Sequence, residues 1–134
     1  MENRVVELSK YRIDKAQKDL ESAEILLNKK LYAQSINRSY YPIFHSVRAL
    51  LAFERFDSRK HSGIISYFNK NFIKTNLIKV KYSEILMKAE KIRTECDYDD
   101  FYMVDESSAQ AQFDNAKSFL LRIKNYIEIN RLIQ

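Results

Sequence analysis

The stretch Ser35-Ile-Asn-Arg-Ser-Tyr-Tyr-Pro-Ile-Phe-His-Ser-Val-Arg-Ala-Leu-Leu51 decides how this chain folds. Its apolar residues return every three or four positions, as they do along one face of an α-helix. Together with the residues just before it, this face consists of Ala33, Ile36, Tyr40, Phe44, Val47 and Leu51. The pattern predicts a helix whose apolar face is buried in a hydrophobic core.

Three further segments carry the same helical spacing of apolar residues. They are Ile13, Ala16, Leu20, Ala23 and Leu27; Tyr82, Ile85, Ala89, Ile92 and Cys96; and Ala109, Phe113, Ala116, Leu120, Ile123 and Ile127. A shorter segment, His61–Phe72, is also expected to be helical, with Ile64, Ile65 and Phe68 pointing inward. The link at residues 28–31 is short, so the first two helices should pack antiparallel. Residues 97–106 are expected to form an acidic loop, after which Ser107 or Ser108 caps the last helix.

These segments predict an all-α fold, an up-and-down four-helix bundle with one additional short helix. We expect a single domain over residues 1–134, with its core at about residues 10–127. The chain has one glycine and one proline, whereas β-sandwiches and barrels need many turns in which these residues are common. The scarcity of turn residues supports the helical interpretation.

The composition points to a cytoplasmic protein with no membrane partner. Cys96 is the only cysteine, which excludes an intrachain disulfide and a cysteine-rich zinc site. The first residues lack the apolar run of a signal peptide, and no stretch approaches the roughly 20 apolar residues that span a bilayer. The net charge of +5 permits binding to nucleic acid without requiring it.

A second stripe on the central helix consists of Arg38, Tyr41, His45 and Arg48. At 100° per residue, Arg38 and His45 lie within about 20° of each other and about 140–160° from Tyr40. We therefore expect this pair to face water, another subunit or a ligand rather than the core. Pro42 lies between them, where it removes one helical hydrogen bond at a local cost of about 3 kcal/mol.

An arginine and a histidine at this spacing can cleave RNA without a metal ion or other cofactor. The guanidinium of Arg38 would bind the scissile phosphate, and His45 would exchange a proton with the ribose 2′-hydroxyl or the leaving oxygen. One histidine serves both steps poorly, so two copies related by a two-fold axis would form a better site. The alternative is an interface in which Arg38 and His45 only form hydrogen bonds.

Three motifs in this order resemble small prokaryotic HEPN domains. They are Asn37-Arg-Ser-Tyr-Tyr-Pro-Ile-Phe-His-Ser-Val-Arg-Ala-Leu-Leu51, Lys60-His-Ser-Gly-Ile-Ile-Ser-Tyr-Phe68 and Arg93-Thr-Glu-Cys-Asp-Tyr98. The resemblance implies a helical bundle that forms a homodimer and pairs with a minimal nucleotidyltransferase in a toxin–antitoxin module. Many members are metal-independent endoribonucleases with an Arg-x(4–6)-His motif, which Arg38 and His45 match. Other members serve as binding or scaffolding subunits.

The chain departs from the family pattern at two positions. Val47 stands where some toxin members have a tyrosine that the partner enzyme modifies with AMP. Pro42 stands where a small helix former is usual. In those toxins the catalytic motif also lies later in the chain than Arg38 and His45 do here.

Several other residues are candidates for binding. His61 could bind phosphate or act as a second acid; alternatively, it caps a helix or forms a buried hydrogen bond. Arg93 and Asp97 are four residues apart, which suits a helix-end ion pair, although with Tyr98 they could also order Arg38.

The face of the central helix and the basic segment after it add further candidates. Tyr41 could stack on a base or pack at a dimer contact, and Arg48 shares its stripe. Lys79, Lys81 and Lys88 belong to a basic segment that could attract RNA, or could simply be solvated. The sequence thus favours an endoribonuclease toxin, with RNA or a nucleotide as ligand. The alternatives are a non-catalytic nucleotide- or substrate-binding subunit of the nucleotidyltransferase and a purely structural dimer.

Overall fold

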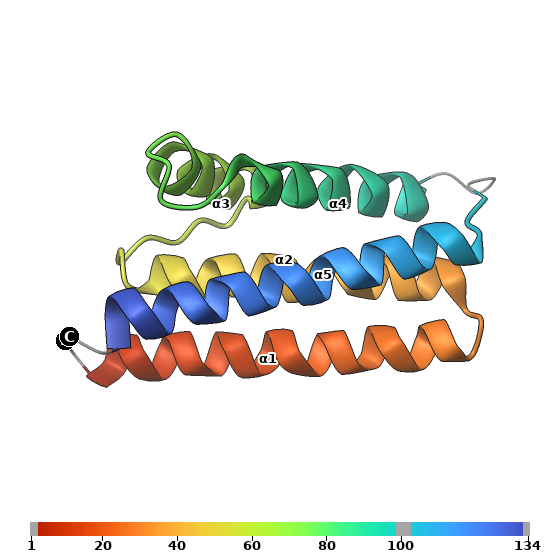
Figure 1. Cartoon of the computed structure of the whole chain (residues 1–134), viewed down its shortest axis with the longest axis horizontal. Coiled ribbons are helices and arrows are strands. Elements are labelled where there is room, and N and C mark those ends of the chain that lie inside the picture. Colours follow the sequence, from red (N-terminus) through yellow and green to blue (C-terminus); the bar gives the residue numbers. More distant parts are fainter. Residues whose placement is uncertain (1–2, 99–102, 133–134) are drawn as a thin grey trace.

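The first two helices pack side by side in opposite directions (Figure 1). In the computed structural model, which describes residues 3–98 and 103–132, these are α1 (Asn3–Asn28) and α2 (Tyr32–Ala52). Lys30 adopts a left-handed conformation with φ 63°, and the N–H of Leu31 donates to the carbonyl of Leu26 at 2.9 Å. This is the hydrogen bond that closes a Schellman turn, so a lysine occupies the position where glycine is usual. The predicted short antiparallel link is confirmed.

The remaining helices complete an up-and-down bundle (Figure 1). The short α3 (His61–Phe68) continues into the π-helix η1 (Asn69–Ile73) and crosses one end of the molecule. It is followed by α4 (Val80–Tyr98), α5 (Glu106–Ile127) and a terminal π-helix, η2 (Glu128–Leu132). The parts of the chain that the structure describes contain no strand. The predicted all-α bundle with one additional short helix is therefore confirmed.

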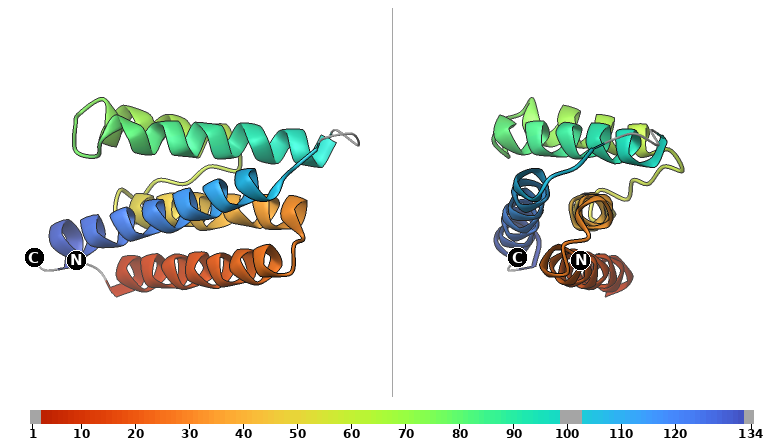
Figure 2. Two further views of the ribbon diagram at one scale, coloured as in Figure 1. Left: turned by 45° about the vertical axis from the view of Figure 1, so that its right-hand side comes forward. Right: turned by 90° about the vertical axis from the view of Figure 1, so that its right-hand side faces the viewer.

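The second helix lies at the centre of the bundle. Figure 2 shows it end-on, with α1, α5 and α4 around it. Fourteen of its 21 residues are buried, which is far more than the single apolar face that its sequence pattern describes. Pro42 is among the buried residues, and the helix continues through it from Tyr32 to Ala52. Because α2 packs against helices on three sides, its polar residues also lie in contact with other helices.

Two predicted boundaries are wrong. The fourth helix extends to Tyr98, so the start of the expected acidic loop is helical; the part of that loop at residues 99–102 lies outside the described residues. Ser108 does not cap α5, and neither does Ser107. The cap is Asp105, whose carboxylate accepts a hydrogen bond from the N–H of Ser108 at 2.8 Å. An aspartate in an extended conformation just before a helix satisfies one of the free N–H groups of its first turn.

The described helices include none that is long and apolar enough to cross a membrane.

Candidate functional site

A carboxylate on α1 brings the predicted pair on α2 together. Asp19 lies 3.4 Å from Nη1 of Arg38 through Oδ1, and 3.7 Å from Nε2 of His45 through Oδ2. The Asp19 side chain is 18% exposed, whereas that of Arg38 is 43% exposed. The three residues thus form a cluster, the Asp19–Arg38–His45 cluster, in which the arginine is open to solvent and the carboxylate is mostly covered.

The prediction that His45 points away from its own subunit is wrong. Its side chain is only 11% exposed and lies against α1. The wheel analysis placed the core on the side of Tyr40 alone, but α1 covers the opposite side of α2 as well. The prediction holds better for Arg38, whose guanidinium is nearly half exposed.

The environment of His45 favours its neutral form. Burial lowers the pKa of this imidazole from its ordinary value of 6.5 to about 4, and the nearby cations Lys15, Arg48 and Arg12 act in the same direction. The Nδ1 atom of His45 is buried and has no hydrogen-bond partner within the described chain. A buried polar atom left unpaired costs about 1–3 kcal/mol, so such atoms are uncommon unless they have a role.

Tyr41 and a pocket adjoin Arg38. The guanidinium lies 5.5 Å from the centre of the Tyr41 ring, and that ring lies 5.8 Å from the ring of His45. Arg38 also lines a pocket of about 440 Å³ together with Asn37, Asp97 and residues near the end of α1 and the start of α2. The Asn37 amide donates to Asp97 at 2.6 Å, so the pocket is bounded by a fixed polar contact between α2 and α4.

The opposite side of α2 carries a separate polar network that faces α3 and α4. The Tyr40 hydroxyl and Nδ1 of His61 are hydrogen-bonded at 2.9 Å. Burial is the main reason that the pKa of His61 is lowered and that the pKa of Tyr40 is raised. Glu90 lies 3.9 Å from Nδ1 of His61 and 3.4 Å from Arg93. Of the two structural roles expected for His61, the structure shows the hydrogen bond and not the cap, since α3 has no side-chain cap. Its expected roles in phosphate binding or as a second acid stay predictions.

The other predicted residues lie near the end of α2 and at the end of α4. The helix-end ion pair between Arg93 and Asp97 is present at 3.2 Å. Arg48 pairs with Asp57 at 2.9 Å, and this carboxylate also accepts from Arg12 at 3.3 Å. Tyr98 is exposed at the end of α4.

The residue that sequence analysis missed is Asp19. It lies beside the apolar stripe of α1, four positions from Lys15 and seven from Arg12, so a polar edge of that helix was visible in the sequence. What was not visible was that this edge faces α2. The described residues contain no group of three or more His, Cys, Asp or Glu side chains that could hold a metal ion.

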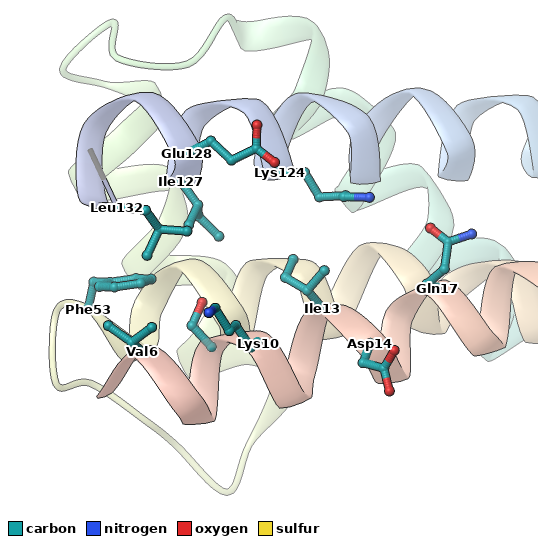
Figure 3. Close-up of a pocket in the computed structure, with 11 residues that line it drawn as sticks. Val6, Lys10, Ile13, Asp14, Gln17, Phe53, Lys124, Ile127, Glu128 and Leu132 are labelled. Atoms are coloured by element: carbon teal, nitrogen blue, oxygen red, sulfur yellow. The ribbon is translucent and has the colours of Figure 1, made fainter. Parts of the chain in front are cut away.

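A pocket of about 300 Å³ lies elsewhere, between α1 and α5 (Figure 3). Its walls are mainly apolar, with Val6, Ile13, Phe53 and Ile127 among them. It contains none of the residues predicted to bind or react.

A protein-family comparison matches residues 9–126 to the HEPN domain. This is most of the chain, which therefore belongs to the HEPN family. Two proteins of Methanocaldococcus jannaschii named "Putative toxin" are 36% and 33% identical to it, over 86% and 87% of this chain and 78% and 86% of their own lengths. A "UPF0332 protein" of Thermotoga maritima is 28% identical over 94% of this chain and 96% of its own. The predicted family is thus confirmed.

Proposed function

We propose that this HEPN protein is a metal-independent endoribonuclease, the toxin of a cytoplasmic toxin–antitoxin pair whose other member is a minimal nucleotidyltransferase. One observation carries the proposal: Arg38 and His45 meet at a single carboxylate, that of Asp19. The relatives named as toxins add support for the toxin role.

The roles of the residues follow from their surroundings. The half-exposed guanidinium of Arg38 binds the scissile phosphate and offsets the charge that develops on its oxygens. His45 is neutral near pH 7, as a general base must be, and the part of its side chain that stays exposed would accept the proton of the ribose 2′-hydroxyl. The 2′-oxygen then attacks phosphorus, and the bond to the 5′-oxygen breaks. The leaving oxygen then takes the proton held by the His45 imidazolium, or by its counterpart in a homodimer once solvent has protonated that counterpart.

The test is cleavage of a structured RNA in EDTA. We expect the wild type to cleave, and His45→Gln and Arg38→Ala to lose activity by about 100-fold or more, since positioned acid–base groups contribute roughly that much. Lys117→Ala is the matched control, because this exposed lysine lies on α5, a helix that contributes no residue to the cluster. Thermal melts establish that each variant is folded. Equal cleavage by the wild type and His45→Gln would exclude this site.

A second candidate function is a non-catalytic subunit that binds a nucleotide or presents substrate to the nucleotidyltransferase. The observation that favours it is the burial of His45, whose side chain is only 11% exposed and whose pKa is about 4, low for a general base. This function predicts a stable complex on co-expression with the nucleotidyltransferase, without RNA cleavage. Calorimetric titration with ATP and GTP, with and without that partner, separates nucleotide binding from scaffolding.

A further inference from the structure

A polar pocket lies one helical turn beyond His45. It has a volume of about 510 Å³ and is lined by Phe44 and Arg48 of α2, by Asp57, Ser58 and Arg59 of the following loop, and by His61 at the start of α3. Three of these six residues carry cationic or imidazole side chains. Because one helical turn rises by about 5 Å, this pocket and the Asp19–Arg38–His45 cluster adjoin on the same helix.

The acid in this pocket is already neutralised. The carboxylate of Asp57 accepts from Nη2 of Arg48 at 2.9 Å, from Nε of Arg48 at 3.3 Å and from Nη2 of Arg12 at 3.3 Å. The N–H of Ser58 donates to it at 2.9 Å. These hydrogen bonds and charges hold the pKa of Asp57 below its ordinary value, against the effect of burial. Two arginines pair with this one carboxylate, and a third, Arg59, lines the pocket, so the pocket keeps an excess of positive charge.

Donors remain available in the pocket after these contacts. Arg59 is exposed and makes no hydrogen bond or ion pair within the described residues. Arg48 uses Nε and Nη2 on Asp57, which leaves Nη1 free of that contact. The ring of His61 is stacked on Phe44 with its centre 4.0 Å away and is tied to Tyr40 through Nδ1, so its Nε2 edge is held in a fixed position.

The loop that presents these donors has a defined shape. The hydroxyl of Ser58 accepts a hydrogen bond from the N–H of Lys60 at 3.2 Å. A Cβ at Gly63 would collide with the Ser58 hydroxyl, so the only glycine of the chain is required where the loop meets the first turn of α3. The positions of Arg59 and His61 are therefore set by local packing.

We propose that this pocket binds a phosphate group, which Arg48, Arg59 and His61 hold through N–H donors. Guanidinium groups suit phosphate because they offer paired donors in a plane and keep their charge. The phosphate belongs either to an RNA strand whose scissile bond lies at the Asp19–Arg38–His45 cluster or to a free nucleotide. If the phosphate belongs to RNA, this proposal rests on the proposed function, because the pocket would then hold a phosphate next to the scissile one in the same RNA substrate.

The test uses the full chain carrying His45→Gln, so that RNA stays intact. Binding of a fluorescent single-stranded RNA is measured by anisotropy over a range of salt concentrations, and binding of ATP by calorimetry. We expect Arg59→Ala to weaken binding of one of these ligands about tenfold and, for RNA, to reduce the salt slope by about one. Arg59→Lys should retain part of the affinity, and Lys117→Ala should match the parent.

The outcomes separate the alternatives. If Arg59→Ala weakens the binding of RNA but not of ATP, RNA is the source of the phosphate. If it weakens the binding of ATP, the source is a nucleotide. If neither ligand binds, or if Arg59→Ala and Gly63→Ala both bind within twofold of the parent, the pocket is not a phosphate site. If instead Arg59 matters for binding while His45→Gln leaves cleavage unchanged in the otherwise wild-type chain, the phosphate site stands and the proposed nuclease site fails.

Discussion

The two histidines of this chain lie on opposite sides of one helix, and their surroundings differ. His45 faces α1, is 11% exposed in its side chain and lies near a carboxylate. His61 packs against the other side of α2, is 36% exposed and is held by a phenol and an aromatic ring. The comparison teaches that burial, rather than the residue type, decides how strongly each imidazole resists protonation.

The largest expected effect is the loss of folding stability that His45 causes at acidic pH. The folded pKa of His45, about 4, lies below its unfolded value of 6.5, so the unfolded chain binds more protons between these pH values. The stability that His45 contributes is thus complete above pH 6.5 and is lost as the pH falls to 4. At 1.36 kcal/mol per pH unit, the loss is at most about 3 kcal/mol.

Urea unfolding at pH 7, 5.5 and 4.5 measures this effect. The wild type should lose stability faster than His45→Gln over this range. His61→Gln is the comparison on the other side of the helix, and it should follow the wild type more closely, because the more exposed His61 is less perturbed. If the free energy of unfolding changed with pH equally in the wild type and His45→Gln, the neutral, buried state of this imidazole would be contradicted.

A smaller effect is expected when the Asp19 carboxylate, which lies between Arg38 and His45, is replaced. Asp19→Asn keeps the size of the side chain but removes the charge that faces both Arg38 and His45. Because groups that orient a reactive residue typically contribute 10–100-fold, we expect RNA cleavage to fall by about that factor. A positioning role also predicts a changed pH profile of cleavage, which loss of folding alone would not produce.

Asp14→Asn is the matched control for this variant. Asp14 lies on the same helix and forms only an exposed ion pair with Lys18 at 3.4 Å, so cleavage should be unchanged. Equal activity and equal pH profiles for Asp19→Asn and the wild type would mean that Asp19 does not act through Arg38 or His45.

The sequence was sufficient for the fold because each long helix carries a local apolar period, from which α1, α2, α4 and α5 were predicted. It also predicted that Arg38 and His45 lie close together, since both are on one helix, and in the structure both reach Asp19. The burial of His45 could not be predicted from the sequence. A helical wheel reveals one apolar face, whereas other helices cover α2 on three sides. The partner Asp19 is 26 residues away in the chain, and no local pattern encodes that pairing.

The smallest effect concerns the other histidine. Tyr40→Phe removes the hydroxyl that holds Nδ1 of His61, while the ring stays in the core. A single hydrogen bond of this kind contributes about 1 kcal/mol, so the free energy of unfolding should fall by that amount. Tyr126→Phe is the control and should change stability less, because the described structure shows no hydrogen bond at the Tyr126 hydroxyl.

Because His61 would be less fixed, Tyr40→Phe should also weaken phosphate binding, though less than Arg59→Ala does. If Tyr40→Phe matched its control in stability and bound phosphate normally, the hydrogen bond would not position His61, and the contrast between the two histidines would rest on exposure alone.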